Sequence, residues 1–147
     1  MAHPECPWLD IAMEELGRGV NEVPGPEANP RIVEYHSITA LKATSDEVPW
    51  CAAFACWCLE KAGVRSPRSA RARDFLKWGQ PSERKIGAIV VLSRGADPRA
   101  GHVGFLYHDR SWEIVLLGGN QGDRVSTRKF LADTVLGYRW PKPEDWK

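Results

Sequence analysis

The sequence contains no long apolar run, no basic leader and almost no net charge, and each absence excludes a class of protein. No stretch approaches the about 18 apolar residues of a membrane-spanning helix. The first residues, MAHPECPWLDIAMEELG, carry acids and a proline where a secretory signal peptide has a basic head and an apolar run. The net charge is only +1, unlike that of a dedicated nucleic-acid binder. We therefore expect no membrane span, no nucleic-acid partner, and synthesis in the cytoplasm without a signal peptide.

The cysteines also lack the spacing of a disulfide framework or a metal site. Cys6 stands near the start, and Cys51, Cys56 and Cys58 crowd into eight residues. Disulfide frameworks use cysteines spread along the chain, and zinc sites pair Cys-x-x-Cys or Cys/His knuckles. We therefore expect free thiols, no metal and no cofactor.

The chain itself has the size and composition of one globular domain. It has 147 residues, of which 43% are hydrophobic and 27% charged, with no internal repeat or low-complexity segment. We therefore expect a single domain over residues 1–147. Its charge is uneven, because residues 1–60 carry about −7 and residues 61–147 about +8. This split fits a charged partner, or two faces of the protein that attract each other.

Apolar spacing and stop signals predict helices in the first half of the chain. The expected helices cover residues 7–17, 30–40 and 51–62, with a short helix in 66–78 capped by Ser66 or Ser69. The helix at 51–62, CAAFACWCLEKA, is apolar nearly all round, which is typical of a helix at the centre of a domain.

After Gly79 the pattern changes to that of strands, expected at residues 85–94, 102–108, 112–118, 123–130 and 134–140. The short connections between them favour antiparallel neighbours. Helices followed by strands predict an α+β fold, with a sheet of about five strands packed on the helix at 51–62.

Cys51 is the first candidate for chemistry, because it opens the expected central helix. The free N–H groups and the positive end of the helix dipole favour a thiolate there, as a nucleophile requires. The alternative is simple packing, since cysteine is often buried. Cys56 and Cys58 lie deeper in the helix and are expected to be structural.

A thiolate nucleophile needs a base, and the best-placed histidine is His102. It follows Gly101 and opens a strand, which leaves its ring accessible, although a buried core histidine is an open alternative. His3 is expected in a frayed tail, His36 on a solvated helix face and His108 in a turn.

The hairpin of residues 102–118 brings a polar segment beside His102. Counting outward from the turn places residue 102 opposite roughly 118, so the Gly-Gly-Asn that follows returns next to the imidazole. Asn120 is the first choice for a side chain that orients the ring, and Gln121 is the second. The alternative is a turn asparagine after two glycines.

Several segments in this order are similar to those of one superfamily: EVPGPEANPRIVEYHSIT, PWCAAFACWCLEKAG, GAIVVLSR, GHVGFLY, LGGNQG and VLGYRWP. Together they resemble the CHAP/NlpC-type cysteine amidohydrolases and peptidases, in particular small single-domain members in phage lysins and type VI secretion effectors. The resemblance implies a papain-like fold and cleavage of an amide bond in the peptide part of peptidoglycan. It also implies Cys51 as nucleophile, His102 as general base and Asn120 as orienting residue, with the third position variable in the superfamily.

The substrate side is expected to be a cleft between an acidic loop face and a basic sheet face. Trp50 and Trp78 are candidate cleft walls, Asp46 and Glu22 candidate ligands for substrate amino groups, and Gln121 a further contact. Core packing of the aromatics and solvation of the loop acids are the open alternatives.

The expected partner is the stem peptide of peptidoglycan, reached after release through a holin-type pore or injection by a contractile machine. An immunity protein is expected only in the second case. Two other functions stay open at this point. One is a cysteine protease or acyltransferase on a non-wall substrate, and the other is a non-catalytic wall-binding module of the same fold.

Overall fold

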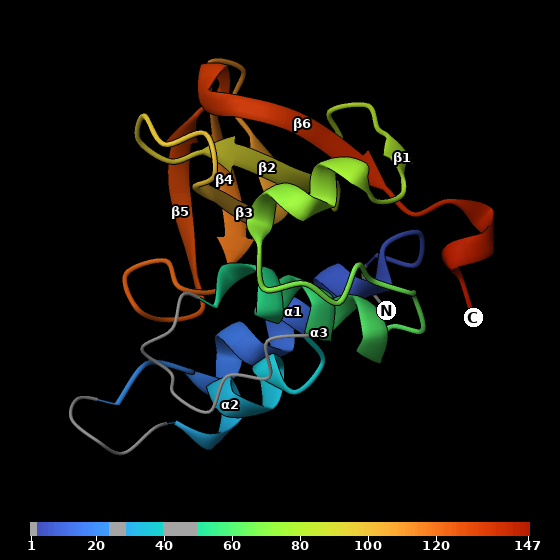
Figure 1. Ribbon diagram of the computed structural model, residues 1–147, viewed down its shortest axis with the longest axis vertical. Helices are drawn as coiled ribbons and strands as arrows, with labels where there is room; N and C mark the ends of the chain where they lie inside the picture. The colour runs from blue at the N-terminus through green and yellow to red at the C-terminus, as the bar shows by residue number, and fades with distance from the viewer. Residues whose placement is uncertain (1–2, 24–28, 40–49) are drawn as a thin grey trace.

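The chain folds into a helical layer and an antiparallel sheet (Figure 1). The structure, a computed structural model, describes residues 3–23, 29–39 and 50–147. The three α-helices lie together on one side of the sheet, and the short 3₁₀ helix η1 crosses beside it. Helices and sheet are segregated, so the fold is α+β, as the sequence predicts. No helix in these described ranges is long and apolar enough to cross a membrane.

The helical layer follows the signals in the sequence. Helix α1 (Pro7–Arg18) ends at Gly19, whose φ of 70° closes the last turn, and α2 (Pro30–His36) begins at Asn29, whose side chain accepts from the N–H of Arg31. Helix α3 (Cys51–Lys61) packs against both and against the sheet. Its first nine residues are all buried, which confirms its central position.

The sheet has six strands in the spatial order β1-β6-β2-β3-β4-β5. Their bounds are Gln80–Pro81 for β1, Ile89–Ser93 for β2, Gly101–Asp109 for β3, Glu113–Gly118 for β4, Ser126–Leu131 for β5 and Val135–Trp140 for β6. The short β1, absent from the prediction, pairs with β6. One face of the sheet joins the helices in the main core, and the other carries a smaller apolar cluster around Leu92 and Leu106.

Several local predictions are wrong: α2 ends at His36 and not at residue 40, His108 lies in β3 and not in a turn, and two further differences have identifiable features. The segment 66–78 holds no α-helix but the 3₁₀ helix η1 (Ala72–Lys77), because Ser69 Oγ donates to Asp74 and accepts from the N–H of Arg71 in a local turn instead of capping a helix. His36, expected on a solvated face, is fully buried. Helix α2 packs against α3, and burial by another helix is not recorded in the sequence of α2 itself.

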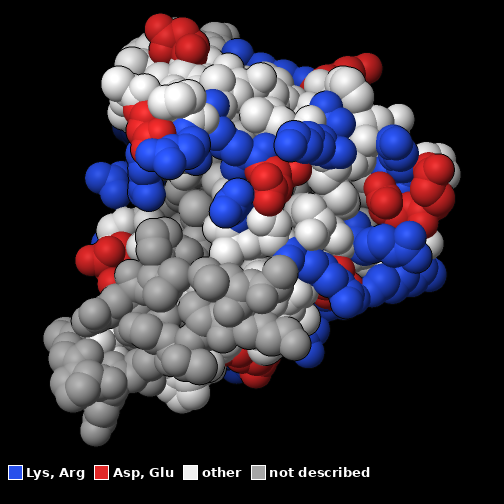
Figure 2. All heavy atoms as spheres, viewed as in Figure 1, with Lys and Arg blue, Asp and Glu red and all other residues white. Residues whose placement is uncertain are grey.

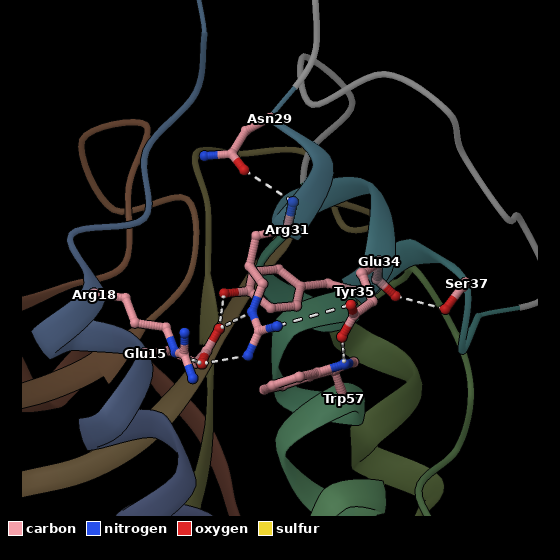
Figure 3. Close-up of polar contacts among 8 residues, drawn as sticks. All are labelled: Glu15, Arg18, Asn29, Arg31, Glu34, Tyr35, Ser37 and Trp57. Atoms are coloured by element: carbon pink, nitrogen blue, oxygen red, sulfur yellow. Dashed lines mark hydrogen bonds and ion pairs between the residues drawn. The ribbon is translucent and has the colours of Figure 1, made fainter.

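A buried carboxylate joins the helices (Figure 3). Glu15 is 1% exposed and accepts two hydrogen bonds from Arg31 at 2.7 and 2.9 Å and one from Tyr35 at 2.6 Å. Arg18 lies 3.1 Å away on the same helix, and the Arg31 guanidinium stacks over Trp57 of α3 at 4.9 Å. These contacts lower the pKa of Glu15 despite its burial, so the charge that ties α1 to α2 is satisfied.

Candidate active site

Cys51 is the first residue of α3 and lies at the bottom of a cavity. Its side chain is 4% exposed, and the cavity of about 230 Å³ lies between η1 and the β2–β3 loop. The described lining residues are Cys51, Ala70, Arg71, Ala72, Arg94, Arg99, Ala100 and Gly101. The position at the helix start is the one that the sequence predicts.

His102 reaches the same place from the sheet. It is the second residue of β3, pairs with Leu92 of β2 and is 4% exposed. The imidazole lies close enough to the Cys51 thiol to lower the pKa of that thiol, against the effect of burial, by hydrogen bonding and charge. The structure therefore brings these two predicted residues together.

The side chain of Gln121 determines which nitrogen of His102 carries the proton. Its Nε2 donates to the carbonyls of Leu116 at 3.1 Å and Ser126 at 2.8 Å, so both amide protons are used. Its Oε1 lies 2.9 Å from Nε2 of His102 and accepts from it. A neutral ring protonated at Nε2 has its lone pair on Nδ1. That atom is buried and has no hydrogen-bond partner of standard geometry among the described residues, which leaves it available to the Cys51 thiol.

The contact to the ring falls on Gln121 and not on Asn120, the first choice from the sequence. Asn120 has a φ of 56°, makes no hydrogen bond to His102 among the described residues, and lines a neighbouring cavity. The preceding glycines allow this arrangement: a Cβ on Gly118 would lie 2.7 Å from Gln121 Oε1, and one on Gly119 would lie 2.7 Å from Cβ of Phe54. The amide of a glutamine can donate to two carbonyls while its oxygen still accepts from a third group. This property of the residue type is the signal by which the sequence could have favoured Gln121.

The four thiols differ sharply in their environment. Burial raises the pKa of Cys51, but hydrogen bonding and charge from His102, the N–H of Val103 and the charge of Arg94 outweigh it, and the net shift is downward. Burial raises the pKa of Cys6 to about 12 and that of Cys56 to about 11, and it raises the pKa of Cys58 well above its usual value. Of the four, only Cys51 has surroundings that favour a thiolate.

Phe130 is a site residue that the sequence does not reveal. Its ring stacks on the imidazole of His102, with centroids 5.3 Å apart and planes at 29°. Both rings line a cavity of about 320 Å³ beyond the ring, together with Leu92, Ser93, Arg94, Asn120, Gln121, Arg128, Leu131 and Thr134. Phe130 belongs to β5, which β4 separates from β3, so no local pattern links it to His102.

Of the predicted substrate contacts, Gln121 lies at the site, whereas Trp50, Glu22 and Trp78 line neither the cavity at Cys51 nor the one at His102. Trp50 is fully buried and its indole N–H donates to Glu22 at 2.9 Å, so this pair supports the start of α3. Glu22 lines a different cavity, of about 590 Å³, beside residues 122–127. Trp78 is 8% exposed and its indole N–H donates to the carbonyl of Arg65 at 2.9 Å. Asp46 lies outside the described residues.

Comparison with known families agrees with this geometry. A sequence model of the CHAP domain matches residues 43–120, more than half of the chain and a region that includes Cys51 and His102. The chain belongs to the CHAP domain family, which confirms the resemblance. Membership indicates amidase or peptidase activity on peptidoglycan in general. No curated protein gives a significant match to the chain.

Proposed function

We propose that this protein hydrolyses an amide bond in the peptide part of peptidoglycan, with Cys51 as nucleophile, His102 as general base and Gln121 as the residue that orients the base. The observation that carries the proposal is the locked amide of Gln121. Because its oxygen accepts from Nε2 of His102, the basic lone pair of the ring is on the nitrogen available to the thiol.

The first half of the reaction forms an acyl-enzyme. Nδ1 of His102 takes the thiol proton, the Cys51 sulfur attacks the substrate carbonyl, and the C–S bond forms. Nδ1 then gives the proton to the leaving amine as the C–N bond breaks. The oxygen of Gln121 faces the protonated ring throughout and stabilises its positive charge.

The second half releases the acyl group to water. His102 takes a proton from water, the hydroxide attacks the thioester, and the thiolate leaves. The N–H groups of the first turn of a helix have no intrahelical acceptors. The backbone N–H of Cys51 is therefore our candidate for one donor to the oxyanion in both halves.

Purified peptidoglycan is the direct substrate for a test. We expect the protein to release soluble fragments with new amine and carboxyl ends, and mass spectrometry of these fragments identifies the bond. Cys51→Ala abolishes release, whereas Cys58→Ala, a thiol removed from the same helix away from the site, retains it. Release by the Cys51→Ala variant contradicts the nucleophile assignment.

The same experiment separates the other functions. A wall-binding module sediments with peptidoglycan and creates no new ends, and an acyltransferase yields a new amide instead of a free carboxyl. The lytic role as a lysin or an injected effector is also part of the proposal. A neighbouring holin gene supports the first, and a neighbouring immunity gene supports the second.

A further inference from the structure

Arginine side chains dominate the cavity at Cys51. Arg71 precedes η1, Arg94 follows β2 and Arg99 lies in the β2–β3 loop, and all three line the cavity. No acidic residue is among its described lining residues. In Figure 2, Lys and Arg atoms gather over η1 and this loop, with some Asp and Glu atoms among them. The described part of the cavity wall is therefore positively charged.

These arginines are largely unpaired. Within the described part of the chain, Arg71 and Arg94 form no ion pair, and Arg99 meets only Asp97, at 3.4 Å, with its own side chain 90% exposed. The neighbouring Arg73 is different, because its Nε donates to the carbonyl of Ala100 at 2.6 Å and braces the loop. Arginine charges around one cavity, with a single exposed ion pair among them, create a potential that attracts an anion.

The two cavities at the site fit the two sides of the scissile bond. His102 hands its proton to the leaving amine, so the amine side of the substrate belongs in the cavity that His102 lines. The cavity at Cys51 has Cys51 but not His102 among its described lining residues, and Arg94 lines both cavities. Because the sulfur attacks the scissile carbonyl, the residue that provides this carbonyl fits the cavity that Cys51 lines, beside Arg71, Arg94 and Arg99.

We propose that the acyl-donor residue of the substrate carries a free carboxylate, which Arg71, Arg94 and Arg99 bind in the cavity at Cys51. This inference rests on the proposed function and adds a substrate requirement to it. The carboxylate would pair with guanidinium groups through charge-assisted hydrogen bonds, which also hold the carbonyl near the sulfur. Stem peptides contain such carboxylates, and conversion to the carboxamide removes the charge with little change in size.

The kinetic test uses pairs of synthetic stem peptides that differ only by carboxylate or carboxamide on the residue that provides the scissile carbonyl. We expect KM to be about tenfold higher for the carboxamide, because it loses about one charge-assisted hydrogen bond. We expect kcat to change little. The double variant Arg71→Gln/Arg99→Gln removes this difference, and 0.5 M salt reduces it, as about a 4 Å Debye length implies.

Arg110→Gln is the matched control. Arg110 lies roughly 25 Å from His102 along the extended β3 and pairs with Glu113 at 3.5 Å, so its loss preserves the tenfold preference. Equal KM values for both peptides in the wild-type protein overturn the inference. A preference that survives in the double variant overturns the assignment to these arginines.

A binding measurement separates this inference from the proposed function. Calorimetry with the inactive Cys51→Ala variant needs no turnover, and we expect the carboxylate peptide to bind about tenfold more tightly than the carboxamide. If the wild-type protein cleaves neither peptide but this preference is present, the proposed function fails and carboxylate recognition stands. If cleavage occurs and binding is equal, the proposed function stands and the inference fails.

Discussion

The arginines of the helical layer have acidic partners, whereas those that line the cavity beside Cys51 have almost none among the described residues. In the first region, Arg31 and Arg18 surround the buried carboxylate of Glu15, and every charge there has a partner (Figure 3). In the second region, the arginines line a cavity with no acidic residue among its described lining. A satisfied charge cluster holds elements together, whereas unsatisfied charge around a nucleophile is suited to a ligand.

The largest expected effect tests the orienting role of Gln121. Gln121→Leu should lower kcat about a thousandfold, because the ring loses the acceptor that selects its tautomer. Asn120→Ala is the matched comparison and should leave the tautomer of His102 unchanged, since no hydrogen bond joins Asn120 to the ring among the described residues. Steady-state kinetics measures both, and ¹⁵N NMR of His102 reports the tautomer. A tautomer change in Asn120→Ala but not in Gln121→Leu would restore the sequence-based choice of Asn120.

The helical layer should respond in stability instead of activity. Glu15→Gln should reduce the free energy of unfolding by about 3 kcal/mol, because it leaves Arg31 and Arg18 without their buried counter-ion. Arg71→Gln/Arg99→Gln should change it by less than about 0.5 kcal/mol, as expected of exposed side chains. Urea denaturation checks both values. A large loss in the arginine variant would mean that those side chains are structural too.

The rate of alkylation distinguishes Cys51 from Cys58, which lie on the same helix but have pKa values shifted in opposite directions. Iodoacetamide at neutral pH should modify Cys51 at least about tenfold faster than any other cysteine, because only its pKa is lowered. Peptide mapping of the alkylated protein identifies the modified thiol. His102→Ala should slow the reaction, since His102 is the main group that lowers the pKa against burial. Uniform labelling would remove the distinction between the thiols.

The smallest effect is the pH dependence of stability. The pKa of Glu15 is lowered and that of Glu60 is about 2, both from an ordinary value of 4.5. Their contribution is fully present above pH 4.5 and is lost as the pH falls toward the lowered values. We expect the urea concentration at the unfolding midpoint to stay constant from pH 7 to pH 5. By pH 3 the free energy of unfolding should fall by about 1–2 kcal/mol. Glu15→Gln should weaken this drop.

Much of the fold could be predicted because its signals are local. Pro7, the cap at Asn29 and the apolar run after Cys51 each mark a helix by its own residues, whereas α1 runs past its expected end at residue 17 and closes at Gly19. The 3₁₀ helix η1 was missed because side chains of Ser69 and Asp74 bind locally, and the short β1 because it exists only by pairing with β6.

The site divides in the same way. Cys51 at a helix start and His102 at a strand start were recognisable, since the sequence itself determines where elements begin. Only the tertiary structure decided that Gln121 holds the ring, that Phe130 stacks on it and that three arginines meet at the thiol. These contacts join segments distant in the chain, and they depend on strand order, a β-bulge after Leu106 and two glycines that permit close approach. Local sequence carries no record of such distances, because they arise only when the sheet closes on the helix.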